Sequence, residues 1–168
     1  ALHVKGVDVG ALKADLTFDS GVGNILIDGD VNQSEGGHSH VTGYIRPAGG
    51  AGIDLTFEAE RLRADFMGKF MDTLFDHVQG RATGKVRLFG VFEEGVTVEG
   101  EADVEDGNIG VRLLGTSYSF SHRLTFTPTS IIFSKIPMRD DEGHTGIVDG
   151  VIRHRFFDNF DLDLTASE

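Results

Sequence analysis

The sequence contains no cysteine, which excludes disulfides, thiolate metal sites and cysteine nucleophiles. Tryptophan is also absent, although packed β-sandwiches usually recruit large aromatic residues, tryptophan included, into their central layers. No apolar run approaches the roughly 20 residues that a membrane-spanning helix needs. Basic residues are few, with 15 Lys and Arg against 27 Asp and Glu, and the net charge of -12 argues against a nucleic-acid partner. The lack of cysteine therefore excludes thiol redox chemistry, and the negative charge argues against nucleic-acid binding.

Proline is scarce as well, and glycine is abundant. The 3 prolines lie in connections or at strand ends, where a missing N–H costs least. The 23 glycines occur in the expected turns and also inside the expected strands, for example at Gly43, Gly84, Gly100, Gly146 and Gly150. Glycines inside strands weaken a flat sheet but let it coil, so we expect a curved sheet.

Apolar and polar residues alternate in several stretches of the chain. Leu12, Ala14, Leu16 and Phe18 begin the pattern, which returns at residues 53–59, 96–104 and 160–166. Strict alternation places apolar side chains on one face of a sheet and polar side chains on the other. We expect strands at residues 12–19, 24–32, 40–46, 53–60, 80–89, 97–104, 108–114, 117–120, 123–127, 130–136, 146–154 and 159–166.

Residues 1–168 therefore form a single β-rich unit, with a β-meander over 1–63 and a continuing sheet over 80–168. Between them, residues 64–79 place Phe66, Phe70, Leu74 and Val78 at every fourth position and precede Gly80. This spacing predicts an amphipathic helix that acts as a lid on the sheet. A membrane-surface helix is less favoured because its polar face lacks Lys and Arg. Since the chain begins at Ala1 without a signal-like segment, we expect it to be a piece of a longer protein.

The apolar face of such a sheet is larger than the predicted lid can cover. About ten strands of ~20 Å at ~4.8 Å spacing share an apolar face on the order of 1,000 Å². A helix of roughly twelve residues is ~18 Å long and ~10 Å across, and it covers about a fifth of that area. Monomeric proteins seldom expose so large an apolar patch, which leaves a sandwich, a closed barrel or a sheet curled around an apolar ligand. The sandwich is the commoner architecture, whereas the mixture of Phe, aliphatic residues and strand glycines favours a groove.

Few residues carry chemistry in a recognisable pattern. His38 and His40 lie on one face of a strand and could ligate a metal, but two histidines in a Gly-rich turn are more often solvated, so we expect neither a metal nor a cofactor. Paired carboxylates at Glu99, Glu101 and Asp103 fit the wet face of a strand better than a catalytic cleft. His154 is expected to be a hydrogen-bonded structural histidine at a strand end. No nucleophile elbow, phosphate loop or dinucleotide fingerprint is present, and we expect no enzyme.

The second half of the chain contains a series of segments in a distinctive order and spacing: residues 80–90, Val98-Glu99-Gly100, the Asp106-Gly107-Asn108 turn, residues 114–120 and residues 126–133. They are followed by a closing block of residues 140–163, with Gly146-Ile147-Val148-Asp149-Gly150-Val151-Ile152-Arg153-His154 and Phe160-Asp161-Leu162-Asp163-Leu164. In these segments the second half resembles the TamB family of translocation and assembly modules, in its Bacteroidetes form. The first half resembles the family more loosely, through Gly43-Tyr44-Ile45-Arg46-Pro47 and the predicted helix.

This resemblance implies a long periplasmic protein anchored in the inner membrane, with AsmA-like and bridge-like lipid-transfer relatives. It implies a mainly β fold whose curved, largely antiparallel sheet is rolled into an open hydrophobic trough, or β-taco. The implied roles are the transport of phospholipid toward the outer membrane and support of outer-membrane protein assembly with a BamA-like partner. The alternative is a closed β-sandwich that serves as a soluble binding or adhesion module.

In the trough, phospholipid acyl chains would contact one set of apolar side chains without a pocket for any headgroup. The expected lining residues are Leu16, Phe18, Ile53, Leu55, Phe57, Val86, Leu88, Val96, Val98, Val111, Leu113, Phe133, Val148, Ile152, Leu162 and Leu164. A sheet cut from a longer one has open edges, so an edge-to-edge homodimer is also possible.

Overall fold

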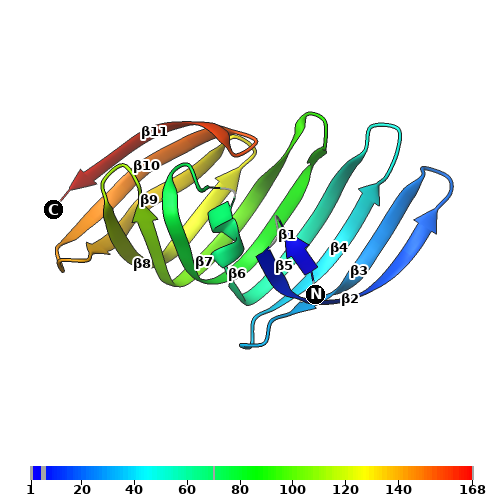
Figure 1. Cartoon of the computed structure of the whole chain (residues 1–168), viewed down its shortest axis with the longest axis horizontal. Coiled ribbons are helices and arrows are strands. Elements are labelled where there is room, and N and C mark those ends of the chain that lie inside the picture. The colour runs from blue at the N-terminus through cyan, green and yellow to red at the C-terminus, as the bar shows by residue number, and fades with distance from the viewer. Residues whose placement is uncertain (1, 5–6, 70, 168) are drawn as a thin grey trace.

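The strands of this protein follow one another across a single sheet in chain order, as a computed structural model shows (Figure 1). The structure describes the backbone of residues 2–4, 7–69 and 71–167, and the side chains from residue 10 onward. Each strand pairs antiparallel with its neighbours in the sequence. The strands are β1 (Leu2–Val4), β2 (Val7–Asp19), β3 (Asn24–Asn32), β4 (His38–Arg46), β5 (Gly52–Arg63), β6 (Phe75–Val91), β7 (Gly95–Val111), β8 (Thr116–Thr127), β9 (Ser130–Asp140), β10 (Thr145–Arg155) and β11 (Asp158–Ser167), and one 3-10 turn, η1 (Asp65–Lys69), precedes β6.

The predicted mainly β fold with a curved antiparallel sheet is confirmed, and the sheet is open. The described strands belong to one sheet whose two edges are β1 and β11. The alternative of a closed β-sandwich is therefore wrong, since a sandwich needs two sheets packed face to face. A closed barrel is also excluded, because β1 and β11 do not pair within the described residues.

The register keeps the alternation of the sequence in phase from strand to strand. Residues that pair directly share a face of the sheet, because side chains alternate along each strand. One row of such pairs crosses β2–β11 without a break and contains only apolar residues and glycine. Its members are Ala14, Gly29, Val41, Phe57, Val86, Gly100, Phe126, Ile131, Ile152 and Leu162.

Glycine is required at positions where a Cβ atom would overlap the backbone of the neighbouring strand. Gly43 in β4 has a φ of 140°, and a Cβ atom there would lie 2.0 Å from the carbonyl oxygen of Asp54 in β5. Gly100 in β7 has a φ of 134°, and its Cβ would lie 2.2 Å from the carbonyl oxygen of Lys85 in β6. Both positions favour glycine because other residues rarely adopt this backbone conformation.

Two apolar clusters form the core. The smaller cluster contains Val31, Val41 and Leu55, with Phe66 of η1 packed against it. The larger cluster occupies the second half of the sheet and is built from Met71, Phe75, Ile109, Phe120, Ile131, Phe133, Ile136, Met138 and Ile152. Ile131, Ile136 and Ile152 are at most 1% exposed, so the second half supplies most of the fully buried side chains.

The predicted amphipathic helix over residues 64–79 is wrong. Among the described residues of this segment only Asp65–Lys69 is helical, as one 3-10 turn, and β6 already begins at Phe75. Strand pairing overrides the helical spacing, because Phe75 pairs with Val111 and Val78 pairs with Ile109 of β7. Gly68 inside the segment also weakens a helix. Phe66 still packs on the smaller cluster, Leu74 and Val78 pack on the larger one, and Phe70 lies outside the described residues.

Two predicted strand breaks are also absent. The sequence predicts a tight link at residues 105–107, but β7 runs through it as a bulge, with Asp106 at a φ of 51° and its backbone N–H donating to Ser121 Oγ at 3.0 Å. The strands predicted at 117–120 and 123–127 are likewise one strand, β8. Among the described residues no helix has the length and hydropathy to cross a membrane.

The buried face of β10 gives a direct test of this core. Ile152 is 1% exposed, whereas Ile147 in the same strand is 43% exposed on the opposite face. We expect Ile152→Ala to lower the free energy of unfolding by about 2–5 kcal/mol, because it leaves a cavity. Ile147→Ala should change it by about 0.5 kcal/mol or less. Urea denaturation followed by circular dichroism measures both, and equal losses would contradict the assignment of faces.

Candidate functional site

The apolar face of the sheet is its inner face. Phe66 of η1 packs against the smaller apolar cluster on this face. Figure 1 shows η1 on the inner side of the curve, where the bent strands partly surround it. The turn η1 therefore covers part of the inner face, as the predicted lid would, but over a much shorter length.

The predicted lining residues fall into three groups by exposure. Leu55, Val98, Phe133 and Ile152 are buried within the core. A second group is partly buried: Ile53, Phe57, Val86, Leu88, Val96, Val111 and Val148. The remaining residues are exposed, and four of them lie on the two outermost long strands: Leu16 (66% exposed) and Phe18 (65%) on β2, and Leu162 (45%) and Leu164 (38%) on β11.

One predicted lining residue is misplaced. The sequence places Leu113 in a strand over residues 108–114, but β7 ends at Val111. Leu113 lies in the turn between β7 and β8 and is 87% exposed. The turn is closed by backbone hydrogen bonds from Leu114 and Gly115 to the carbonyl of Val111, which end the ladder before Leu113 is reached.

Several inner-face residues are absent from the predicted lining. Val41, Phe126 and Ile131 belong to the unbroken apolar row, yet the sequence analysis does not include them. For Phe126 and Ile131 the signal that could have identified them is the Pro128-Thr129 turn, which sets Thr127 opposite Ser130 and hence Phe126 opposite Ile131. Register follows from turn length, so this pairing was accessible from the sequence.

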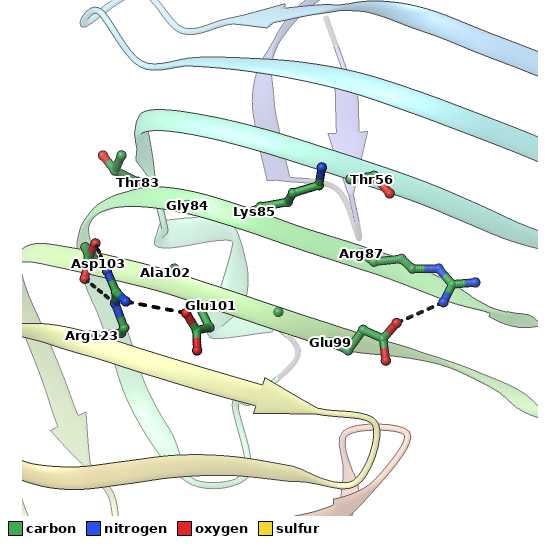
Figure 2. Close-up of a pocket in the computed structure, with 11 residues that line it drawn as sticks. Thr56, Thr83, Gly84, Lys85, Arg87, Glu99, Glu101, Ala102, Asp103 and Arg123 are labelled. Atoms are coloured by element: carbon green, nitrogen blue, oxygen red, sulfur yellow. Dashed lines mark hydrogen bonds and ion pairs between the residues drawn. The ribbon is translucent and has the colours of Figure 1, made fainter.

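The outer face carries a shallow hollow lined by paired charges (Figure 2). Arg87 lies between two carboxylates, with 2.7 Å from its Nη2 to Asp54 Oδ2 and 2.9 Å from its Nη1 to Glu99 Oε1. The hydrogen bond from Arg87 holds the pKa of Asp54 below its usual value. Arg123 likewise donates to both carboxylate oxygens of Asp103, at 2.9 Å each.

The carboxylates of this hollow therefore form ion pairs with arginine side chains. Glu99, Glu101 and Asp103 all lie on the outer face, as predicted for the wet side of a strand. Glu101 contacts Arg123 at 3.5 Å. Glycoside hydrolysis by paired carboxylates needs two carboxyl groups that face each other across a cleft, whereas these three lie along one strand and contact arginines. The arrangement pairs opposite charges across β5–β8, which favours the observed register.

The histidines at 38 and 40 lie on the same outer face and contact carboxylates. His38 Nε2 and His40 Nδ1 each lie 3.1 Å from Asp30 Oδ1, and His40 Nε2 lies 3.3 Å from Asp28 Oδ1. The hydrogen bond to Asp30 raises the pKa of His40, and the same contact lowers the pKa of Asp30. In the part of the chain that the structure describes, no group of three or more such side chains has the geometry to hold a metal ion.

His154 is a buried structural residue, as predicted. It is 5% exposed near the end of β10, and its Nδ1 accepts a hydrogen bond from the backbone N–H of Phe157 at 3.2 Å. Its ring stacks on that of Phe157, with centroids 4.4 Å apart. Burial lowers the pKa of His154, so the ring is neutral near pH 7.

The turn after His154 reaches across the sheet to β7. Phe156 and Phe157 form the two-residue turn between β10 and β11, with φ values of 53° and 58°. Positive φ is costly for bulky residues and persists only where contacts impose it. Here the ring of Phe156 lies over Gly95 of β7, where a Cβ atom would be 2.3 Å from Phe156 Cγ. The contact joins β7 to the β10–β11 turn, three strands away in the sheet.

A scan against protein-family models, a search of curated proteins and a search of solved structures each return no match to this chain.

His40 on β4 makes the free energy of unfolding depend on pH. Because its folded-state pKa is raised, the stabilisation from His40 and Asp30 is complete below the unfolded pKa of about 6.5 and is lost as pH rises through the folded value. We expect Asp30→Asn to lower the pKa of His40 toward 6.5 and to destabilise the protein more at about pH 6 than at about pH 8. An NMR titration of the His40 ring measures the first effect. An unchanged pKa in Asp30→Asn would refute the pairing.

His154 should make the free energy of unfolding depend on pH in the opposite direction. Its folded-state pKa is lowered, so the unfolded state binds more protons below about pH 6.5 and stability falls on acidification. We expect the free energy of unfolding of the wild type to decrease between about pH 7 and pH 5 relative to His154→Phe, which cannot titrate. Denaturant unfolding across this range measures the difference. Parallel pH profiles for the two proteins would rule out a buried neutral imidazole.

Proposed function

We propose that the inner face of this sheet is a groove for lipid acyl chains, in a segment of a longer periplasmic protein of the TamB type. The observation that carries the proposal is the unbroken apolar row across β2–β11. At both ends of the sheet, large apolar side chains on this face remain exposed, namely Leu16 and Phe18 on β2 and Leu162 and Leu164 on β11.

The chemistry of this row suits a ligand that must slide. Burial of apolar area is favourable by about 25 cal/mol per Å² and has no preferred direction. An acyl chain can therefore move over the exposed apolar side chains of this face, which lie on β2 and β11, with little change in free energy, whereas Val41, Ile131 and Ile152 are at most 3% exposed and belong to the core. The row itself contains only apolar residues and glycine between Ala14 and Leu162. The curvature of the sheet, with η1 on the inner side, would make it the wall of an open trough.

The wider role rests on the resemblance to TamB. In such a parent protein, the groove would carry phospholipid toward the outer membrane and support the assembly of outer-membrane proteins with a BamA-like partner. The parent would be anchored in the inner membrane, and this segment would lie in the periplasm. We propose no catalytic role, since the outer hollow holds its carboxylates in ion pairs.

Photo-crosslinking at matched positions tests the groove. We would place a benzophenone side chain at Phe18 or Leu164 on the inner face, and at Leu26 or Ile147 on the outer face. Leu26 is 40% and Ile147 is 43% exposed, which is close to Leu164 at 38%, so exposure alone does not explain a difference. In the presence of phosphatidylcholine vesicles, we expect acyl adducts at the inner positions and few at the outer ones, as detected by mass spectrometry.

Two outcomes would overturn this proposal. Equal adduct yields on the two faces would show non-specific contact with the vesicles. An absence of adducts at the inner positions, together with native mass spectra free of bound lipid, would show that the inner face does not accommodate acyl chains.

A further inference from the structure

The 3-10 turn η1 lies across the inner face in the first half of the sheet. Its Cα atoms come within 8 Å of those of β6 and also of those of β2. In the sheet, β2 and β6 are separated by β3, β4 and β5. One short turn contacts both strands because the sheet curves between them and η1 lies on the inner side of that curve (Figure 1). The turn therefore bridges the concave side of the first half.

Phe66 of η1 contacts the apolar side chains beneath the turn. It packs against the smaller cluster, in which Val31, Val41 and Leu55 are 1%, 3% and 8% exposed. Val41 is a member of the unbroken apolar row. An acyl chain that followed this row from β2 toward β6 would need the space that the Phe66 ring occupies, because packed protein interiors leave few voids. In this structure η1 therefore closes the first half of the proposed groove.

The chain is fastened to the sheet on both sides of η1. Before the turn, the backbone N–H of Ala64 donates to the carbonyl oxygen of Gly80 at 3.0 Å. After it, Met71 is buried in the larger cluster, and Arg112 Nε donates to the carbonyl oxygen of Asp72 at 2.6 Å. None of the residues of η1 itself is buried. The turn can therefore leave the inner face between two fixed ends, with the loss of one aromatic contact.

We propose that η1 is a gate on the acyl-chain groove, and that an entering acyl chain displaces Phe66 from Val31, Val41 and Leu55. This inference rests on the proposed function, because it takes the acyl chain as the occupant. Apolar burial has no preferred direction, so an acyl chain can cover the side chains that Phe66 covers in the closed form. A ligand that binds only the open form shifts the population toward that form. The gate thus shields the groove from water until a lipid enters.

A disulfide can hold the gate closed. A Cβ atom on Gly68 of η1 would lie 3.8 Å from Val78 Cβ in β6. Disulfides join Cβ atoms about 3.5–4.5 Å apart, so Gly68→Cys together with Val78→Cys has the geometry to form one. The native sequence contains no cysteine, so no competing disulfide can form. Reduction of the same protein releases the gate and provides the matched control.

Photolabelling from the lipid tests the gate. We would mix the double variant with vesicles of a phosphatidylcholine that carries a diazirine on one acyl chain, irradiate the mixture, and map the labelled residues by mass spectrometry. The first half is read at Ile27, Ile53 and Phe57, which pack around the smaller cluster, and the far end is read at Leu162 and Leu164 of β11. We expect oxidation to reduce labelling in the first half about tenfold relative to the reduced protein. Labelling of β11 should not change.

Substitution of Phe66 tests the gate in the other direction. Phe66→Ala removes the contact that holds the closed form, so we expect labelling of the first half to rise about threefold. Met67→Ala is the matched control, because Met67 lies in the same turn but belongs to neither apolar cluster, and it should leave labelling unchanged. Circular dichroism checks that each variant keeps the β fold.

Failure of the gate and failure of the groove give different results. Equal labelling of the first half in the oxidised and reduced forms, or labelling of β11 alone in both forms, would overturn the gate and leave the groove standing. Loss of labelling on β11 together with the first half on oxidation would show a general effect of the disulfide, which also overturns the gate. No label on the inner face of any strand in either form would overturn the proposed function and the gate with it.

Discussion

The structure depends on one constraint, the row of direct pairs that carries the period-two alternation of the sequence from β2 to β11, although bulges shift the register elsewhere in the pairs from β5 to β11. A shift of one residue at any pair would turn every later apolar side chain to the opposite face. The chain avoids this shift with short turns, such as Pro128-Thr129, and with ion pairs across the outer face, of which Asp54–Arg87–Glu99 spans three strands. The turns and these ion pairs together favour the register that makes the other face apolar, although individual exposed ion pairs contribute little stability.

Stability and accessibility are distributed unevenly along the sheet. The second half buries its inner face in one large cluster, in which Ile131, Ile136 and Ile152 have almost no exposed surface. In the first half, Val31, Val41 and Leu55 form a smaller cluster under Phe66, and the inner face of β2 is exposed. The strained Phe156–Phe157 turn belongs to the well-packed half, where the stacking on His154 and the contact over Gly95 can offset its backbone cost. The two apolar clusters therefore lie between the ends of the inner face, β2 and β11, where apolar side chains are exposed.

Much of this fold follows from the sequence, because alternation and turn residues act locally. The faces of β2, β5, β7 and β11 could be assigned from residues such as Leu16, Leu55, Val98 and Leu164 alone. The segment 64–79 could not, since its helical spacing competes with a ladder to β7 that is distant in the chain. The bulge at Asp106 could not be told from a turn either, because Gly107 and its acidic neighbours are typical of both bulges and turns. The exposure of Leu16 and the burial of Val98 depend on the place of each strand in the sheet, which no short pattern encodes.

Strict pairing between chain neighbours makes this sheet behave as a one-dimensional array. Each strand needs only the strands before and after it, so ordering can begin at any hairpin and spread in both directions, as in repeat proteins. Contacts between neighbours also close short loops, which speeds folding for a protein made of strands. The same property lets evolution add or remove a hairpin within the meander without disturbing distant pairs, so that a wall of this kind can lengthen in steps of two strands.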